Sequence, residues 1–83
     1  MSTLETILQE DWLYTLYKKN KDYYLSAVCG RATVFTVTVQ LTDAEKKKFA
    51  EQGETYIKSM AYAIIDSPNS FVDRSVDIPS NDN

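Results

Sequence analysis

The 83-residue sequence has no histidine, a single cysteine, only two glycines and only two prolines. The missing imidazole excludes a Ser-His or Cys-His nucleophile pair and a histidine-ligated metal. One thiol cannot form an intrachain disulfide or a thiolate-rich zinc site, and two glycines leave little for a glycine-rich phosphate loop. We therefore expect a non-catalytic binding protein with no cofactor and no metal.

Long apolar runs and targeting signals are also missing. No stretch approaches the ~18 apolar residues that a membrane-spanning helix needs. Residues 1–5 have neither the basic region nor the apolar core of a secretory signal. Together with the lone Cys29, which we expect to be a buried and inert thiol, this predicts a cytoplasmic protein without membrane contact.

Acidic residues exceed basic ones, and the formal net charge is −3. The excess lies entirely in residues 66–83, since the preceding residues hold equal numbers of acidic and basic side chains. This balance argues against a protein that binds nucleic acid by neutralising phosphates. The one basic run, Lys46 to Lys48, is typical of a solvated helix face.

Apolar spacing predicts the secondary structure. Leu4, Ile7 and Leu8 recur at i, i+3 and i+4, which favours a short helix over residues 4–11. Strands are predicted at 12–17, 23–29 and 34–41, separated by a polar turn at 18–22 and a connection at Gly30.

A long helix is predicted after the strands. Thr42 and Glu45 form a capping box, and Pro68 limits the helix to about residue 66. Gly53 lies within this helix, on or beside its apolar stripe, and either lets the helix approach the sheet closely or marks a kink.

These elements predict an α+β fold in which a three-stranded antiparallel meander forms one layer. The order is α-β-β-β-α, with both helices on one face of the sheet. The domain spans residues 1–70, followed by an acidic tail, 71–83, that docks through Phe71 and Val72 and is disordered after about Pro79. The predicted core is Leu4, Ile7, Leu8, Leu25, Ala27, Phe35, Val37, Val39, Leu41, Phe49, Tyr56, Ile57, Met60 and Ile64.

The uncovered sheet face is the candidate binding site. Two helices cover only one face, and the other would carry β-branched residues and tyrosines, which suit protein contacts. A plain solvated face is an equally good interpretation. The predicted partner-binding residues are Tyr14, Tyr24, Val34, Thr36, Thr38, Asp73 and Asp77.

Aromatic residues interleaved with lysines in residues 12–24 admit a second interpretation. This pattern occurs in proteins that bind single-stranded nucleic acid. The charge balance weighs against it, and we expect no direct nucleic-acid partner.

A resemblance bears on function. The strand Tyr24–Gly30, the segment Leu41–Glu45, Gly53, and Pro68 before Phe71 resemble small bacterial proteins grouped with the toxin-immunity proteins of interbacterial competition systems. The resemblance covers roughly residues 12–75 and implies stoichiometric neutralisation of one cognate toxin, without catalysis. The alternatives are a small structural subunit that dimerises through the open sheet face, and a phage-type inhibitor whose acidic tail mimics phosphate.

Overall fold

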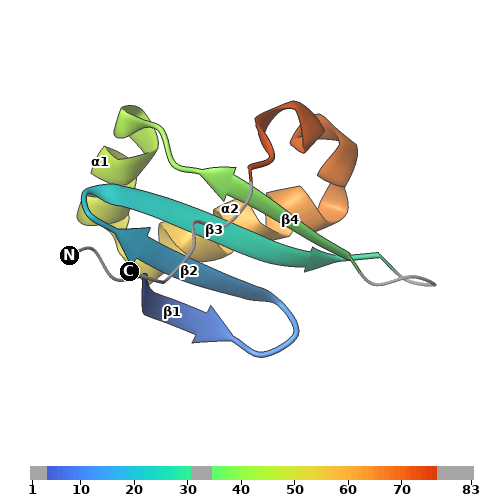
Figure 1. The fold of residues 1–83 in the computed structure, drawn as a ribbon, viewed down its shortest axis with the longest axis horizontal. Helices are drawn as coiled ribbons and strands as arrows, with labels where there is room; N and C mark the ends of the chain where they lie inside the picture. Colours follow the sequence, from blue (N-terminus) through green and yellow to red (C-terminus); the bar gives the residue numbers. More distant parts are fainter. Residues whose placement is uncertain (1–3, 31–34, 77–83) are drawn as a thin grey trace.

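The fold is a four-stranded antiparallel sheet followed by two helices. A computed structural model describes residues 4–30 and 35–76. Its strands β1 (Glu5–Glu10), β2 (Tyr14–Lys19), β3 (Asp22–Cys29) and β4 (Phe35–Gln40) pair in the order β1-β2-β3-β4. The helices α1 (Asp43–Gln52) and α2 (Glu54–Asp66) come next, and the short 3₁₀ turns η1 (Pro68–Ser70) and η2 (Val72–Arg74) follow them (Figure 1). The α+β class is confirmed, but the sheet has four strands rather than three.

The predicted N-terminal helix is wrong, because residues 5–10 form the edge strand β1. Glu5 pairs with Lys18 and Glu10 pairs with Tyr14, and the register shifts between Thr6 and Leu8. An isolated helix of two turns is marginal in water, whereas a hairpin with β2 satisfies the backbone of this segment. The bulge breaks the two-residue alternation, which explains why the apolar spacing imitated a helix.

The order of elements is therefore four strands and then two helices. Both helices lie on one face of the sheet, behind it in the view of Figure 1, and the opposite face is turned toward the viewer. No helix precedes the first strand within the described residues, so the predicted α-β-β-β-α order is wrong.

The core lies between the sheet and α2. Eight predicted core residues are buried: Leu25, Ala27, Val37, Val39, Leu41, Ile57, Met60 and Ile64. Leu8, Phe49 and Tyr56 are partly buried against that core. Leu4 is half-buried, while Ile7 and Phe35 are exposed. The prediction missed Tyr14, Leu16 and Ala61, which are all buried, whereas the expected burial of Cys29 is confirmed.

The single long helix predicted after Thr42 is instead two helices, divided at Gly53, which has a φ of 72°. The predicted capping box is confirmed: the Glu45 N–H donates to Thr42 Oγ1 (3.2 Å), and the Thr42 N–H donates to Glu45 Oε1 (2.8 Å). A Cβ on Gly53 would meet nothing within 4 Å. Glycine is therefore needed for its backbone conformation, not for a close approach to the sheet.

Residues after α2 return to the sheet. Phe71 packs against the core, as predicted, but Val72 is exposed. Ser75 bridges to Val39, and the Val76 N–H donates to the Thr38 carbonyl (2.8 Å). This short pairing covers part of the β4 edge. The predicted disorder after about Pro79 falls outside the described residues.

Candidate functional site

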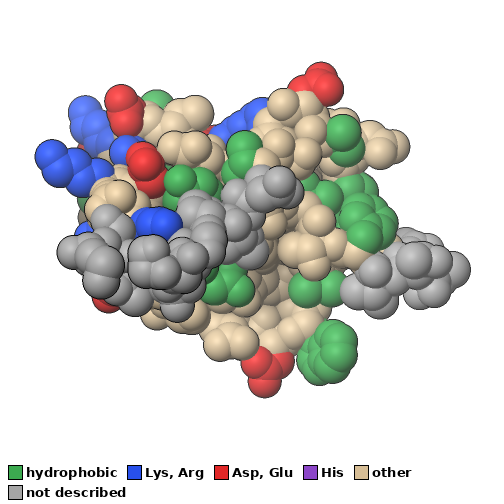
Figure 2. Space-filling model, in the orientation of Figure 1, with side chains coloured by type: hydrophobic (Ala, Val, Ile, Leu, Met, Phe, Trp, Pro, Cys, Tyr) green, Lys and Arg blue, Asp and Glu red, His purple; other side chains and the backbone are tan. Residues whose placement is uncertain are grey.

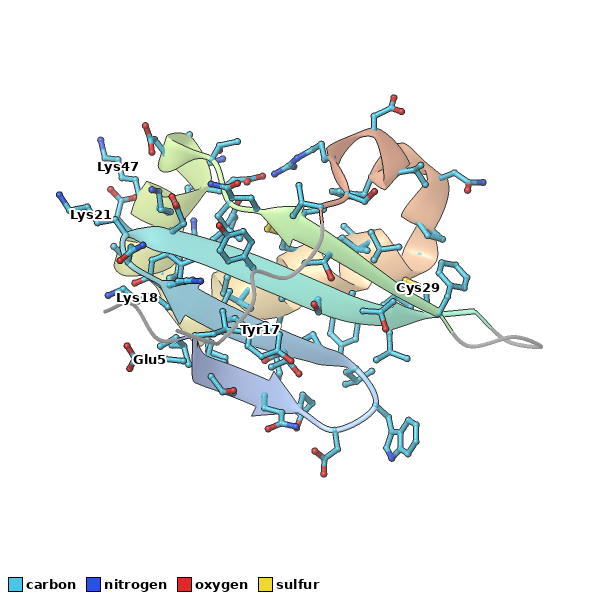
Figure 3. All side chains as sticks on the ribbon, viewed as in Figure 1. Glu5, Tyr17, Lys18, Lys21, Cys29 and Lys47 are labelled. Atoms are coloured by element: carbon cyan, nitrogen blue, oxygen red, sulfur yellow. The ribbon has the colours of Figure 1, made fainter. Side chains whose placement is uncertain are left out.

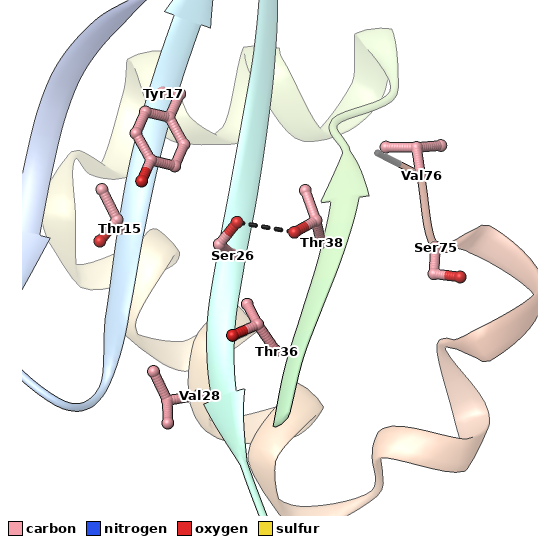
Figure 4. Close-up of a pocket in the computed structure, with 8 residues that line it drawn as sticks. All are labelled: Thr15, Tyr17, Ser26, Val28, Thr36, Thr38, Ser75 and Val76. Atoms are coloured by element: carbon pink, nitrogen blue, oxygen red, sulfur yellow. Dashed lines mark hydrogen bonds between the residues drawn. The ribbon is translucent and has the colours of Figure 1, made fainter. Parts of the chain in front are cut away.

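A hollow occupies the sheet face that the helices leave uncovered. Alternate residues of three strands point to this face because strand side chains alternate with a period of two. The hollow has a volume of about 640 Å³ (Figure 4). Its lining, called here the hydroxyl groove, consists of Thr15, Tyr17, Ser26, Val28, Thr36, Thr38, Ser75 and Val76.

Two buried hydroxyls lie at the centre of the hydroxyl groove. Ser26 Oγ and Thr38 Oγ1 are 2.7 Å apart and share a hydrogen bond, and both residues are nearly inaccessible. Thr38, a predicted partner-binding residue, thus contributes to the floor of the groove. Thr36, the next predicted residue on the same face of β4, is exposed.

Tyr24 is also on the uncovered face, as predicted. It pairs directly with Tyr17 on β2 and with Gln40 on β4. Directly opposite residues of antiparallel strands place their side chains on the same face about 5 Å apart. Tyr17 and Tyr24, called here the tyrosine pair, therefore form a cross-strand pair beside the hydroxyl groove.

The assignment of Tyr14 to the binding surface is wrong. Tyr14 pairs with Ala27, which puts its ring on the helix side of the sheet, where it is 2% exposed. Its hydroxyl donates to Glu54 Oε2 (3.0 Å). Burial, with the added effect of the Glu54 carboxylate, raises the pKa of Tyr14 to about 12. The residue is part of the core.

The remaining predicted site residues do not join the hydroxyl groove in the described structure. Asp73 is exposed in η2 and is not among the lining residues. Val34 and Asp77 lie outside the described residues.

Exposed aromatic side chains lie near the end of the sheet where β3 ends and β4 begins. Trp12 is 84% exposed, Tyr62 51% and Phe35 46%. We call these three residues the aromatic end. Phe35 and Tyr62 line a second hollow of about 540 Å³, together with Gly30, Ile65, Asp66 and Pro68. The prediction that Phe35 belongs to the core is wrong, because alternation alone does not show that an open hollow lies between the start of β4 and the end of α2.

Trp12 has an unusual backbone for its residue type. It lies in the β1–β2 turn, closed by the Leu13 N–H that donates to the Glu10 carbonyl (3.0 Å), and its φ is 66°. Such left-handed positions favour glycine or asparagine, and the β2–β3 turn follows that preference with Asn20 at φ 60°. Neither burial nor turn preference accounts for tryptophan at this position.

Lysines gather at the opposite end of the sheet. Lys46 Nζ donates to the Lys21 carbonyl (3.2 Å), which joins α1 to the β2–β3 turn. Blue side chains cluster at this end in Figure 2, and Figure 3 labels three of them. The group, called here the lysine end, consists of Lys18, Lys19, Lys21, Lys46, Lys47 and Lys48. Sequence reasoning missed it because residues 18–21 and 46–48 meet only in the folded chain.

The described residues lack a cluster of side chains that could hold a metal ion. No group of three or more Cys, Asp or Glu side chains among residues 4–30 and 35–76 is placed to hold a metal ion. In the same part of the chain no helix has the length and apolarity to cross a membrane. Cys29 is 1% exposed, and burial raises the pKa of its thiol. An activated nucleophile would require a lowered pKa.

The burial of Cys29 leads to a prediction about thiol labelling. In the folded protein at pH 8, iodoacetamide should modify Cys29 far more slowly than it modifies a free cysteine, because the thiol is both inaccessible and protonated. Mass spectrometry over time measures the rate, and the protein in denaturant is the control. Equal rates in both conditions would contradict the assignment of Cys29 to the core.

Comparison with known proteins yields no relative: no protein-family model, no curated protein and no solved structure matches the chain significantly. Function therefore has to be argued from the surfaces described above.

Proposed function

We propose that this protein is a non-catalytic binding module that inserts Trp12 into a pocket of a protein partner. The observation that carries the proposal is a tryptophan 84% exposed at a left-handed turn position. A backbone of this kind in a non-glycine residue costs about 1–2 kcal/mol. Tryptophan is, with tyrosine and arginine, one of the residue types enriched among interface residues that dominate binding energy. A binding role explains both the exposure and the unfavourable backbone.

The neighbouring residues supply the rest of a contact surface. The Val28 N–H donates to the Leu13 carbonyl (2.8 Å), and Cys29 pairs with Phe35, so one strand separates the Trp12 turn from Phe35. Two strand spacings amount to about 10 Å. The aromatic end therefore fits within one interface of ordinary size, which has about 800 Å² per partner.

The charges near the aromatic end indicate the chemistry of the partner. Glu10 and Asp11 precede Trp12, and Asp66 lines the hollow beside Phe35. A partner with an apolar pocket and a basic rim complements this surface. A second copy of the chain would bring these carboxylates together, which disfavours a homodimer through this end.

The specific role that we propose is stoichiometric inhibition of a partner protein in the cytoplasm, as in toxin immunity. The likeness of residues 24–30 and 41–45 to such proteins supports it, together with the inaccessible thiol and the missing histidine. An inhibitor needs a stable surface, not reactive groups.

The binding experiment uses Trp12 as its own reporter, since the chain has a single tryptophan. Adding the partner should shift Trp12 emission to shorter wavelength, because the indole leaves water. Trp12→Gly should weaken binding at least about 30-fold, which corresponds to the 2 kcal/mol of a dominant interface residue. The free energy of unfolding of the Trp12→Gly variant should equal that of the natural protein or exceed it by up to about 1 kcal/mol, because glycine tolerates the left-handed backbone.

Val72→Ser is the matched control, since Val72 is an exposed apolar residue outside the aromatic end. The partner comes from affinity capture with the natural protein, and titration calorimetry measures the purified pair. Equal binding by the Trp12→Gly and natural proteins would overturn the proposal. A dimer in light scattering whose Trp12 emission does not change with concentration would instead support the alternative of a structural subunit that dimerises through the open sheet face.

A further inference from the structure

Six of the seven lysines of the chain belong to the lysine end. They come from two segments about 25 residues apart in sequence, and the bond from Lys46 Nζ to the Lys21 carbonyl joins those segments. The near neutrality of residues 1–65 therefore hides a basic region, because lysine gathers at one end of the fold. A protein of negative net charge can present such a surface, since charges interact over about 10 Å at ordinary salt.

The nearby carboxylates only partly neutralise the lysine end. Asp43 and Asp22 both contact Lys46, at 3.2 and 3.8 Å. Glu5 is opposite Lys18 in the β1–β2 register. Among the described residues, no acidic side chain lies within ion-pair distance of Lys21, Lys47 or Lys48. These three ammonium groups remain available to an anionic partner.

The tyrosine pair continues from the lysine end onto the uncovered sheet face. Tyr17 and Tyr24 oppose each other across β2 and β3, and Lys19 follows Tyr17 on the same face of β2. Figure 3 shows Tyr17 in front of the sheet. Lys18 belongs to the helix side of β2, where its Nζ lies 5.5 Å from the centroid of the Tyr23 ring. Aromatic rings on a sheet beside lysines are the arrangement on which bases stack while phosphates are neutralised.

The hydroxyl groove extends the same track. Tyr17 lines the groove, and Thr15, Thr36 and Ser75 add hydroxyl groups along it (Figure 4). Side-chain hydroxyls are frequent donors to phosphate and sugar oxygens. Lys19, the tyrosine pair and the hydroxyl donors thus follow one another on the uncovered face, and the lysines of the β2–β3 turn and of α1 lie at its end.

We propose that the lysine end, the tyrosine pair and the hydroxyl groove together bind single-stranded nucleic acid. Bases can stack on the tyrosine pair only if they are exposed. A single strand therefore fits this surface better than a duplex, in which the bases are stacked on each other. An acidic protein segment would use the lysines but leave the tyrosine pair and the groove without a role. The surface is separate from the aromatic end, so this proposal goes beyond the protein-binding function and does not depend on it.

The test is fluorescence anisotropy of a labelled single-stranded oligothymidine of ~15 nucleotides, near the upper site size of one small domain. We expect binding that weakens with salt, with a slope near −2 in a double-logarithmic plot if three lysines contact phosphate. Lys47→Gln should reduce the magnitude of that slope by about 0.7. Lys58→Gln is the matched control, because Lys58 is an exposed lysine on the other helix, outside the lysine end.

The tyrosine variants separate nucleic acid from a general polyanion. Tyr17→Ala and Tyr24→Ala should each weaken binding by at least about fivefold, and Tyr17→Phe should retain most of the affinity, because stacking needs the ring and not the hydroxyl. Circular dichroism melting verifies that every variant is folded. The Trp12→Gly protein should bind the oligonucleotide normally.

Three outcomes would overturn the proposal. The first is no binding at low salt. The second is equal affinity for polyglutamate with no effect of the tyrosine substitutions, which would assign the lysine end to an acidic protein. The third is equal or tighter binding of a duplex of the same length, because a duplex cannot use the tyrosine pair.

Discussion

Replacing Tyr14 by alanine is expected to lower the free energy of unfolding by about 3–5 kcal/mol, the range for removing a large aromatic side chain from a core. The ring is 2% exposed and belongs to the core that Leu16, Leu25 and Ile57 also form. The substitution leaves a cavity on the helix side of the sheet and removes the donor to Glu54. Urea denaturation monitored by circular dichroism measures the change.

Tyr17→Ala is the control for this prediction, because Tyr17 occupies the same strand but the opposite face. We expect it to cost less than about 1 kcal/mol, as for a substitution outside the core. A similar loss for both variants would contradict the face assignment of β2. Tyr14→Phe should fall between them, at about 1 kcal/mol, because it removes only one hydrogen bond.

The loss of stability at alkaline pH should also depend on Tyr14. The pKa of Tyr14 is about 12 in the folded protein, above the ordinary value of 10.0. The group therefore contributes stability that is fully present below pH 10 and is lost as the pH rises through the folded value. Tyr14→Phe should show a smaller loss of stability between pH 10 and pH 12 than the natural protein.

Breaking the contact between Arg74 and Glu45 is expected to cost about 1.5–3 kcal/mol, the range for hydrogen bonds to charged groups. Arg74 donates from both terminal nitrogens to the two oxygens of Glu45 (3.0 and 2.6 Å) and to the Gln40 carbonyl (3.2 Å). The same carboxylate caps α1 through the Thr42 N–H. Arg74→Met should therefore loosen both the C-terminal segment and the first turn of α1.

The stabilisation by the Arg74–Glu45 contact should depend on pH, in a direction set by the pKa of Glu45. Burial, the largest single influence, would raise the pKa of Glu45, but the hydrogen bonds from Arg74 and Thr42 together outweigh it and hold the pKa below its ordinary value. The stabilisation is therefore fully present above the ordinary glutamate value of about 4.3 and is lost as the pH falls through the folded value.

A double-mutant cycle of Arg74→Met, Glu45→Gln and the double variant isolates the coupling free energy between the two side chains. Thermal unfolding at pH 7 and at pH 3 measures the stability of each protein. The coupling should shrink at pH 3. The control pair is Lys46 and Asp43. Because the Asp43 carboxylate is fully exposed, this pair should contribute little to the free energy of unfolding at either pH. Coupling of equal size in the two pairs would contradict the structural role of Arg74.

Local signals in the sequence were sufficient where a few neighbouring residues set the conformation. The capping box at Thr42 and Glu45 and the alternation of apolar residues from Val37 to Leu41 could both be predicted, because each depends on backbone geometry or on nearest neighbours. The absence of histidine, with its consequence for catalysis, likewise needs no fold.

The other features of the fold and of the candidate site depended on contacts between residues that are far apart in the sequence. Whether residues 5–10 form a helix or a strand depended on β2, and the face of Tyr14 depended on its register with Ala27. Exposure of Phe35 depended on where α2 ends, and the lysine end on the contact of α1 with the β2–β3 turn. The sequence by itself determined the class of fold, the start of the helical region at Thr42, its end near Asp66 and the missing histidine. Only the tertiary structure decided which side chains share a surface, because long-range register and packing bring together residues that no local pattern connects.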